Sequence, residues 1–531
     1  MKKYAALVLA LFVFLSLACR AVGLIPVQDG TGPVETFTPI GPTPSLTETR
    51  LPPTETPTFS PTPSFTPTST PSLTPEPTGD TTPSFTVRYH PDHALFAGDQ
   101  VSLEVIAPPG VDVSGQSVSV RTDKPGGDGL GPVEFQPFGI EGRMQATFSW
   151  AWDTSDLEPD SYTLTYSVEP AGYQWEESLV LHPPGALPPP EPWAEWASTE
   201  SECCTIHYIT GTEAERDLEW LLERIDEVAR QISIEMGLEL DERVTLTLLP
   251  RVLGHGGFAG DGISVSYLDR NYAGSSFEMV LHHEMVHILD GRIGGELRPT
   301  ILVEGLAVYL SGGHYKPEAI LARAAALLEI NEGEFAGSTG WYKPLEPLAD
   351  SFYPAQHEIG YLQAAALVKF MVNTWGWEAF NAFYRDIHPH PSGSHAQAID
   401  AALQVHFDLS FSQLEQMLLE ELGRQEVTQE DIQDVRLTIE FYESVRRYQQ
   451  YMDPSAYFMT AWLPDRAEMR ERGIVADFVR RPTAPANIIL EEMLVDAHQH
   501  LLAGRYEATE MALANLQVEL ERQILEATMA Y

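Results

Sequence analysis

A stretch rich in proline and threonine, from Thr31 to Pro83, sets the first limit on how this chain can fold. It holds fourteen prolines and only eight large apolar residues. Because proline fixes φ and lacks a backbone N–H, the stretch cannot form a packed core and favours extended polyproline II. At ~3.1 Å per residue it could reach on the order of 150 Å. We therefore predict a stalk here, or an untethered disordered tail, and folded domains only beyond it.

The residues before this stretch are typical of an export signal. Two lysines precede an apolar run over residues 4–17, which is too short to span a bilayer comfortably. The run ends in Leu-Ser-Leu-Ala-Cys, which resembles a bacterial lipobox, although Ser16 stands where leucine is usual. We predict a signal peptide over residues 1–19 and lipidation of Cys19. The protein would then be extracytoplasmic, either held at the cell surface by this lipid anchor in the membrane or secreted.

The net charge of the chain limits which partners it can bind, and its length limits how many domains it can contain. The 531 residues include 32 Lys and Arg against 76 Asp and Glu, a formal net charge of -44. A protein this acidic repels phosphate, so nucleic acid is excluded as a partner. The length has room for about two to four domains. Changes in composition divide the chain into a signal peptide (1–19), a stalk (20–83), a β domain (84–184), a central domain (193–424) and a helical region (425–531).

Between residues 84 and 184 the chain changes to short runs of alternating apolar and polar residues. Each run has the period of two expected of a half-buried strand, and clusters of Gly, Pro and Asp separate the runs. About six or seven strands over about a hundred residues predict an immunoglobulin-like β-sandwich, with a spacer as its default role. The predicted strands include Phe85–Tyr89, Val101–Val105, Val118–Arg121, Met144–Phe148 and Tyr162–Val168.

The stretch from Ser275 to Asp290 carries the clearest chemical pattern of the chain. A serine N-cap, an acid in the first turn and a glycine after the last turn predict a helix of about four turns. His283 and His287 stand four residues apart on it, so their imidazoles project from one face and can bind one metal ion. Glu284 is rotated so that its carboxylate reaches a metal-bound water rather than the metal. This His-Glu-x-x-His pattern is the signature of zinc metallopeptidases, in which the glutamate takes a proton from that water.

A second helix, predicted over Pro299 to Ser311, carries a single carboxylate, Glu304, among apolar residues. A buried carboxylate needs a partner, and a metal ion would supply it. The segment resembles the third-ligand helix of the gluzincins, the thermolysin-like metallopeptidases that hold zinc with two His and one Glu. The resemblance implies that Zn2+ is held by His283, His287 and Glu304. It also implies that Glu284 is the general base.

A further stretch, Gly360–Phe370, resembles a helix of the aminopeptidase N family that opens with a tyrosine stabilising the tetrahedral oxyanion. The resemblance implies this role for Tyr361, although a tyrosine that merely packs at a helix start is an equally good interpretation. Asp290 lies on the same helix face as the two histidines, where it either fixes an imidazole tautomer or is a helix-surface acid. The family's Gly-x-Met-Glu-Asn pattern is absent from Gly256 to Leu268, which favours an endopeptidase over an aminopeptidase.

Predictions for the elements around this site are less specific. Gly262–Leu268 is predicted as a strand that, like its equivalent in gluzincins, forms an open sheet edge where an extended substrate can pair. Two free thiols are the favoured interpretation of the adjacent Cys203 and Cys204, and a vicinal disulfide is the alternative. Beyond Gln425 we predict helices, including one over Ala456–Val479 and a final αα-hairpin. These helices would support the fold, cap the cleft or bind a protein partner.

These patterns together predict a multidomain protein. An N-terminal all-β immunoglobulin-like sandwich is followed by an α+β zincin-like metallopeptidase domain and a C-terminal α-helical region. The resemblance implies an exported, Zn2+-dependent enzyme that hydrolyses peptide or protein substrates, more in the manner of an endopeptidase. Two alternatives stay open: a non-catalytic cell-surface binding protein with a structural zinc site, and an aminopeptidase with an atypical amine anchor.

Overall fold

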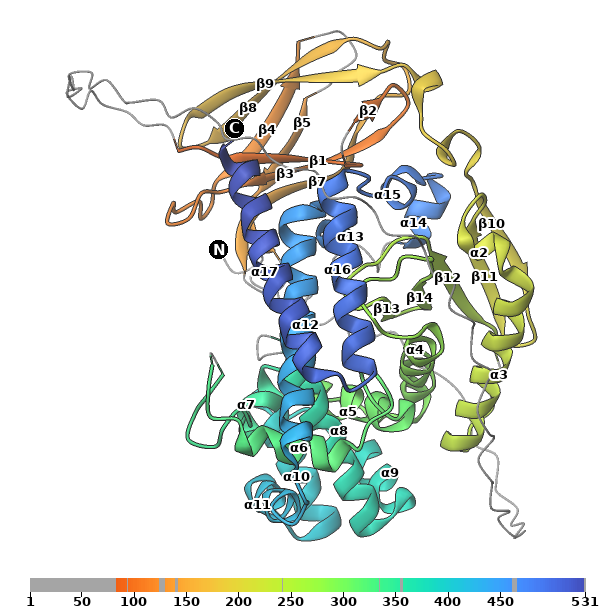
Figure 1. The fold of residues 1–531 in the computed structure, drawn as a ribbon, viewed down its shortest axis with the longest axis vertical. Helices are drawn as coiled ribbons and strands as arrows, with labels where there is room; N and C mark the ends of the chain where they lie inside the picture. The colour runs from red at the N-terminus through yellow and green to blue at the C-terminus, as the bar shows by residue number, and fades with distance from the viewer. Residues whose placement is uncertain are drawn as a thin grey trace, which may run out of the picture. The chain divides into compact units, whose positions relative to one another are not determined.

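The computed structural model describes residues 83–529, apart from 93, 124–128, 139–141, 241, 334, 354–356 and 461–465. The predictions of a signal peptide, of lipidation at Cys19 and of nearly all the stalk lie outside the described residues. From Thr82 onward the chain forms one unit, with a β-rich part first, a mixed α/β part next and helices last (Figure 1). Within the described ranges, we find no helix with the length and apolar character needed to cross a bilayer.

Two sheets make up the β-rich part, in the strand orders β1-β3-β7-β6 and β2-β9-β8-β4-β5. Alternate residues of the central strands point into one shared core, as Leu164 and Tyr166 do on β8. The predicted strands are all present, and the immunoglobulin-like assignment stays a prediction. The strands are β1 Thr86–His90, β2 Leu95–Phe96, β3 Gln100–Ile106, β4 Ser117–Thr122, β5 Leu130–Glu134, β6 Gln136–Phe138, β7 Arg143–Asp153, β8 Ser161–Glu169 and β9 Tyr173–His182.

The mixed α/β part is built on a five-stranded sheet of order β10-β11-β12-β14-β13. The central strands β11, β12 and β14 run parallel, while β10 and β13 pair antiparallel at the two edges. The prediction that the strand at Gly262–Leu268 forms the open edge is wrong, because the glycine-rich stretch before it folds back and adds β13 outside it. The elements are β10 Trp196–Glu200, β11 Cys204–Ile209, α2 Glu213–Arg216, α3 Leu218–Met236, β12 Val244–Leu249, β13 Gly257–Ala259 and β14 Ile263–Ser266.

Helix α4 packs against the β13–β14 side of this sheet, and α5 and α8 pack beyond it. Ser276 caps α4, because its side chain accepts a hydrogen bond from the backbone N–H of Met279. The predicted helix is confirmed and runs three residues further, to Ile293. The helices are α4 Phe277–Ile293, α5 Thr300–Ser311, α6 Ile320–Glu329, α7 Leu345–Asp350, α8 His357–Trp375, α9 Trp377–Arg385, α10 His395–Phe407 and α11 Phe411–Leu422.

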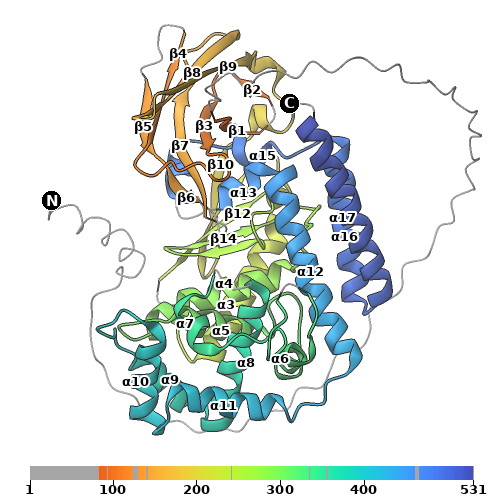
Figure 2. The same cartoon turned by 90° about the vertical axis from the view of Figure 1, so that its left-hand side faces the viewer.

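In the C-terminal region α16 and α17 form a hairpin that packs along the long helix α12 (Figures 1 and 2). The single helix predicted over Ala456–Val479 is wrong, since that stretch contains three short helices and the described residues 472–475 are not helical. Gly473, at φ 68°, places the backbone in a conformation that a continuing helix cannot use. The helices are α12 Gln429–Met452, α13 Pro454–Thr460, α14 Arg466–Glu471, α15 Ala476–Val479, α16 Pro485–Leu502 and α17 Tyr506–Met529.

Buried polar contacts fix the β-rich part to this C-terminal region. The guanidinium of Arg480 donates hydrogen bonds to both carboxylate oxygens of Asp99, each at 2.7 Å, and it also pairs with Glu191. The ring of His90 lies 2.6 Å from the Ser455 hydroxyl through Nδ1 and stacks on Phe458. The two parts therefore share an interface that is both ionic and apolar.

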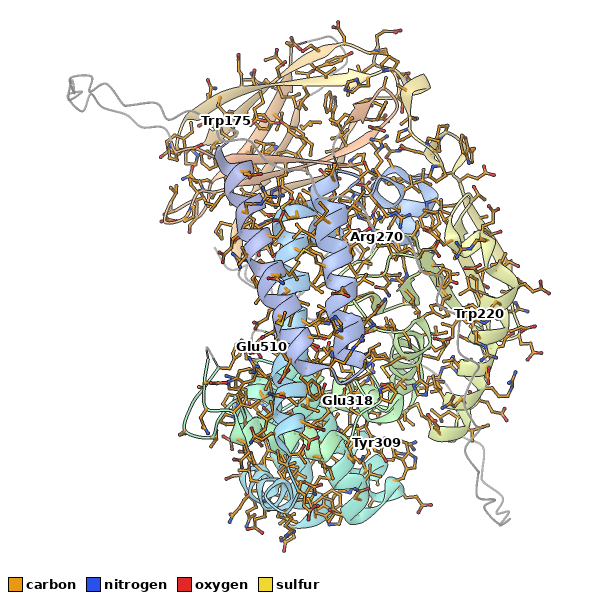
Figure 3. All side chains as sticks on the ribbon, viewed as in Figure 1. Trp175, Trp220, Arg270, Tyr309, Glu318 and Glu510 are labelled. Atoms are coloured by element: carbon orange, nitrogen blue, oxygen red, sulfur yellow. A yellow bond between two sulfur atoms is a disulfide. The ribbon has the colours of Figure 1, made fainter. Side chains whose placement is uncertain are left out.

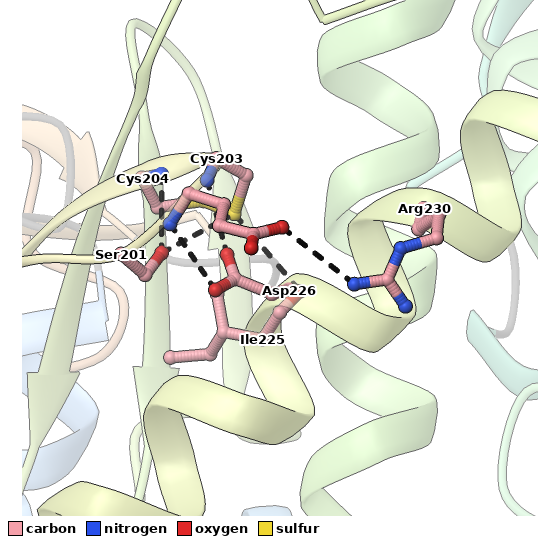
Figure 4. The surroundings of a disulfide bond; sticks show 7 residues. Ser201, Cys203, Cys204, Ile225, Asp226 and Arg230 are labelled. Atoms are coloured by element: carbon pink, nitrogen blue, oxygen red, sulfur yellow. Dashed lines mark hydrogen bonds and ion pairs between the residues drawn. A yellow bond between two sulfur atoms is a disulfide. The ribbon is translucent and has the colours of Figure 1, made fainter.

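Cys203 and Cys204 are joined by a disulfide at the start of β11 (Figure 4). The favoured prediction of two free thiols is therefore wrong. The Asp226 carboxylate of α3 accepts hydrogen bonds from the backbone N–H groups of Glu202 and Cys203, at 3.1 and 3.0 Å. The hydroxyl of Ser201 accepts another from the Cys204 N–H at 3.2 Å. These bonds hold the turn that carries the disulfide against α3. No pattern in the sequence predicts them.

Candidate metal centre

Helices α4 and α5 bring together His283, His287 and Glu304, which we call the first cluster. The two histidines stand one turn apart on α4, with their ring centroids 4.7 Å apart. Glu304 projects toward them from α5, whose neighbouring side chains are almost all apolar and buried. The predicted ligands from two separate helices thus lie side by side, as the sequence spacing and the lone carboxylate require.

Distances within the first cluster match the needs of a tetrahedral metal ion. The two Nε2 atoms of His283 and His287 lie 3.1 Å apart, and each lies 3.3 Å from Glu304 Oε2. Ligand atoms about 2.0–2.1 Å from a tetrahedral zinc ion lie about 3.3–3.4 Å from one another. Glu304 Oε2 is buried and has no hydrogen-bond partner among the described residues. A small divalent cation fits these three donors and would satisfy that oxygen.

The three groups of the first cluster shift one another's pKa values. Burial lowers the pKa of His283 to about 4. Burial acts the same way on His287, but the Glu304 carboxylate outweighs it and raises the pKa of that imidazole to about 9. The Glu304 carboxyl is buried as well, yet the two histidines hold its pKa well below the ordinary value. A metal ion would meet ligand atoms that already lie close together.

Glu284 lies beside the first cluster and against the edge strand. Its carboxyl group is buried, and burial raises its pKa to about 7, the range in which a general base works well at neutral pH. Strand β13 approaches it so closely that a Cβ on Gly257 would lie 2.6 Å from Glu284 Oε1 and 2.4 Å from Val280 Cγ1. Glycine at position 257 therefore leaves the room that the carboxylate occupies.

Two tyrosines lie at the first cluster, one predicted and one not. Tyr361, in the first turns of α8, is buried with its ring centroid 6.1 Å from that of His283. Tyr353 precedes α8, and its hydroxyl donates a 2.8 Å hydrogen bond to Glu304 Oε1. Nothing in the sequence around Tyr353 marks it as a functional residue, because its loop has no motif and no helical period.

Asp290 is completely buried, but its hydrogen bonds do not go to an imidazole. Its Oδ2 accepts from Arg298 Nε at 3.0 Å and from the Tyr384 hydroxyl at 2.9 Å. The Nδ1 atoms of His283 and His287 have no hydrogen-bond partner within the described part of the chain. No hydrogen bond therefore supports the suggested role of Asp290 in fixing an imidazole tautomer. The alternative, an acid on the helix surface, does not fit either, because Asp290 is buried.

A second group of ligand-type residues, which the sequence did not reveal, lies next to the first. It consists of His255, His314 and Glu358, which we call the second cluster. The His314 ring stacks on Tyr361 at 4.1 Å, and its centroid lies 5.9 Å from that of His283. The two clusters are therefore neighbours that share Tyr361 as a boundary.

Comparison with known proteins gives little beyond this geometry. No family model matches the chain, and no curated protein matches it. Among solved structures, the chain is similar to the aminopeptidase N family protein from Idiomarina loihiensis, with 10% sequence identity and a TM-score of 0.27. The match covers 66% of this chain and 78% of that chain. At this TM-score the likeness carries no argument, so the site rests on its own residues.

Proposed function

We propose that this protein is a zinc-dependent metallopeptidase that cleaves within peptide chains. The observation that carries the proposal is the triangle of ligand atoms in the first cluster, 3.1–3.3 Å on each side, with Glu284 next to it. A purely structural zinc site has no use for a buried carboxylate with a pKa raised to about 7 at its rim. The donor set of two imidazoles and one carboxylate leaves a fourth position for water, as in catalytic zinc sites.

The roles of the residues follow from their positions. Zn2+ bound by His283, His287 and Glu304 would acidify a water and polarise the substrate carbonyl. Glu284 would accept the proton of that water and pass it to the leaving amine. Tyr361 would donate a hydrogen bond to the oxyanion from its hydroxyl.

The edge strand β13 supplies a place for an extended substrate. It pairs with β14 on one side only within the described sheet, so no described strand takes up the backbone groups of its other side, where a peptide strand would pair. Its residues are Gly257, Phe258 and Ala259, none of which can hold a free amine by charge. This favours cleavage inside a chain over removal of an N-terminal residue.

Three full-length proteins test this function together: the wild type, Glu304→Ala and Glu284→Gln, with Glu278→Gln on the same helix as a matched control. Metal content and cleavage of a mixed peptide library are measured for each. We expect zinc and cleavage in the wild type and the control, loss of tightly bound zinc in Glu304→Ala, and zinc without cleavage in Glu284→Gln. Zinc in a wild type that cleaves nothing would favour the non-catalytic binding protein, and a folded wild type without zinc would refute the proposal. Cleavage only of peptides with a free N-terminus would favour the aminopeptidase.

Export and anchoring are a separate proposal that depends on residues 1–19 alone. We propose that Cys19 is lipidated and holds the enzyme at the cell surface, because an apolar run after two lysines ends in a lipobox-like sequence. Labelling with a radioactive fatty acid should mark the wild type and not Cys19→Ser. Label in both proteins, or in neither, would contradict it.

A further inference from the structure

The second cluster has the composition of a metal site in its own right. His255 comes from the loop before β13, His314 from the loop after α5, and Glu358 from the first turn of α8. Each offers one ligand atom, and these atoms all lie within 4.8 Å of one another. The side chains are 15%, 14% and 5% exposed, respectively. Two imidazoles and one carboxylate suit first-row divalent transition metals.

Glu358 is the centre of this arrangement. Its Oε2 lies 2.8 Å from His314 Nδ1, and its Oε1 lies 3.5 Å from His255 Nδ1. One carboxylate thus faces one nitrogen of each ring. One of these distances is shorter and the other is longer than the separations of 3.1–3.3 Å in the first cluster, so a bound ion would require the side chains to shift.

Both histidines are held in place by their surroundings. The His255 ring lies 4.3 Å from the ring of Tyr442, whose hydroxyl is 2.8 Å from the hydroxyl of Ser275. The backbone N–H of His314 donates a 2.8 Å hydrogen bond to Glu318. Figure 3 labels Tyr309 and Glu318, which lie on either side of His314 in the sequence. Ligands supported in this way need little reorganisation to bind an ion.

A cation of the protein already stands beside these ligands. Arg446, from α12, has its Nη1 3.5 Å from His255 Nε2 and 3.7 Å from Glu358 Oε1. Both distances are long for a hydrogen bond or a tight ion pair, and the Arg446 side chain is 28% exposed. Its positive charge balances Glu358 and opposes the approach of a metal ion at the same time.

We propose that the second cluster binds a divalent first-row transition-metal ion, separate from the ion of the first cluster. Arg446 sets the affinity of this site by charge competition. Because the His314 ring stacks on Tyr361, an ion that fixes His314 also restrains the tyrosine at the boundary of the two clusters. The proposal does not depend on the proposed function, since a chain without the first site would still bind this second ion.

Titration of the metal-free full chain with Zn2+ in a calorimeter tests the proposal. We expect two Zn2+ per wild-type chain and one each for Glu304→Ala and His255→Gln. Competition with a chelator should show that the tighter ion is missing in Glu304→Ala and the weaker one in His255→Gln. Removal of the positive charge in Arg446→Gln should tighten the weaker ion at least about tenfold. This last variant gains binding, so a folding defect cannot imitate its result.

Three outcomes would overturn the second site. The first is a wild type and an Arg446→Gln variant that each bind a single ion, which would leave the cluster a hydrogen-bond network only. The second is a weaker ion whose affinity changes in neither His255→Gln nor Arg446→Gln. The third is loss of that ion in His388→Ala, whose imidazole is 63% exposed, because the ion would then be an adventitious surface ligand. A wild type that binds only the weaker ion, at the second cluster, would refute the proposed function but not the second site.

Discussion

The two clusters contain the same set of ligand groups, two imidazoles and one carboxylate, yet they are built in opposite ways. In the first cluster two ligands share one helix at a spacing of four, and the third stands on the next helix. In the second, His255, His314 and Glu358 come from three segments that are distant in sequence. The first cluster has a buried acid beside it and no described Arg or Lys within ion-pair distance of Glu304, whereas the second has Arg446. The roles we propose differ accordingly: catalysis for the first cluster, and binding of a weaker ion opposed by a fixed charge for the second.

The largest effect is expected from removing the acidic group of Glu284, which only the first cluster has beside it. Glu284→Gln should lower kcat/KM for a cleaved peptide by about 10²–10⁴-fold, because an amide cannot accept the proton of water. Zinc at the first cluster should be retained. Glu278→Gln serves as the control, and a loss below tenfold in Glu284→Gln would mean that Glu284 is not the base.

The next largest effect is expected at the boundary between the clusters. Tyr361→Phe keeps the ring that stacks on His314 and removes only the hydroxyl. If the hydroxyl donates to the oxyanion, kcat should fall by about 10²–10³-fold with little change in KM. An unchanged kcat in a folded variant would leave Tyr361 a packing residue, which is the other interpretation of its place at the start of α8.

A smaller effect should follow from crowding Glu284 without changing its chemistry. In Gly257→Ala the new Cβ would collide with Glu284 Oε1 and Val280 Cγ1, so the carboxylate must move. A displacement of about 1 Å in an active site can cost about 10²-fold in rate. We expect such a loss in kcat with zinc affinity at the first cluster unchanged. Full activity would show that the carboxylate works from a position other than the one seen here.

The smallest expected effect concerns how firmly the first cluster holds its ion. Tyr353→Phe removes the hydrogen bond to Glu304 Oε1, and loss of such a supporting bond lowers metal affinity by about 10–100-fold. Competition with a chelator measures it. Tyr309→Phe, on the same helix as Glu304, should change nothing. Equal affinities of wild type and Tyr353→Phe would show that packing alone orients Glu304.

The residues whose relative positions the sequence predicted are those that follow a local period. His283, Glu284 and His287 are fixed relative to one another by the helix itself, and the prediction needed only the helix to form. Glu304 was found because a lone carboxylate in an apolar helix needs a partner. Strands with period two and the capped helix α4 were predicted for the same reason.

The features that the sequence did not predict depend on contacts that only the tertiary fold creates. The second cluster joins three loops and turns with no shared period, and Tyr353 reaches Glu304 from a loop without a motif. Asp290 was placed on the correct helix, but Arg298 and Tyr384 take up its carboxylate. The prediction took β14 as the edge of the sheet, whereas β13 lies outside it. A strand of three residues such as β13 is too short to give a recognisable pattern in the sequence.

The contact between Asp99 and Arg480 has a consequence for the order in which the molecule is completed. The two residues are separated by 381 positions. At a synthesis rate of ~5–20 residues per second, Arg480 is made roughly 20–80 s after Asp99. During that time the apolar surface around Trp150, which ends up packed with Phe458 and Phe478, is open to water and to chaperones. The C-terminal region therefore covers an apolar surface of the β-rich part only after it has been synthesised. A chain whose synthesis stops before Arg480 would leave that surface exposed.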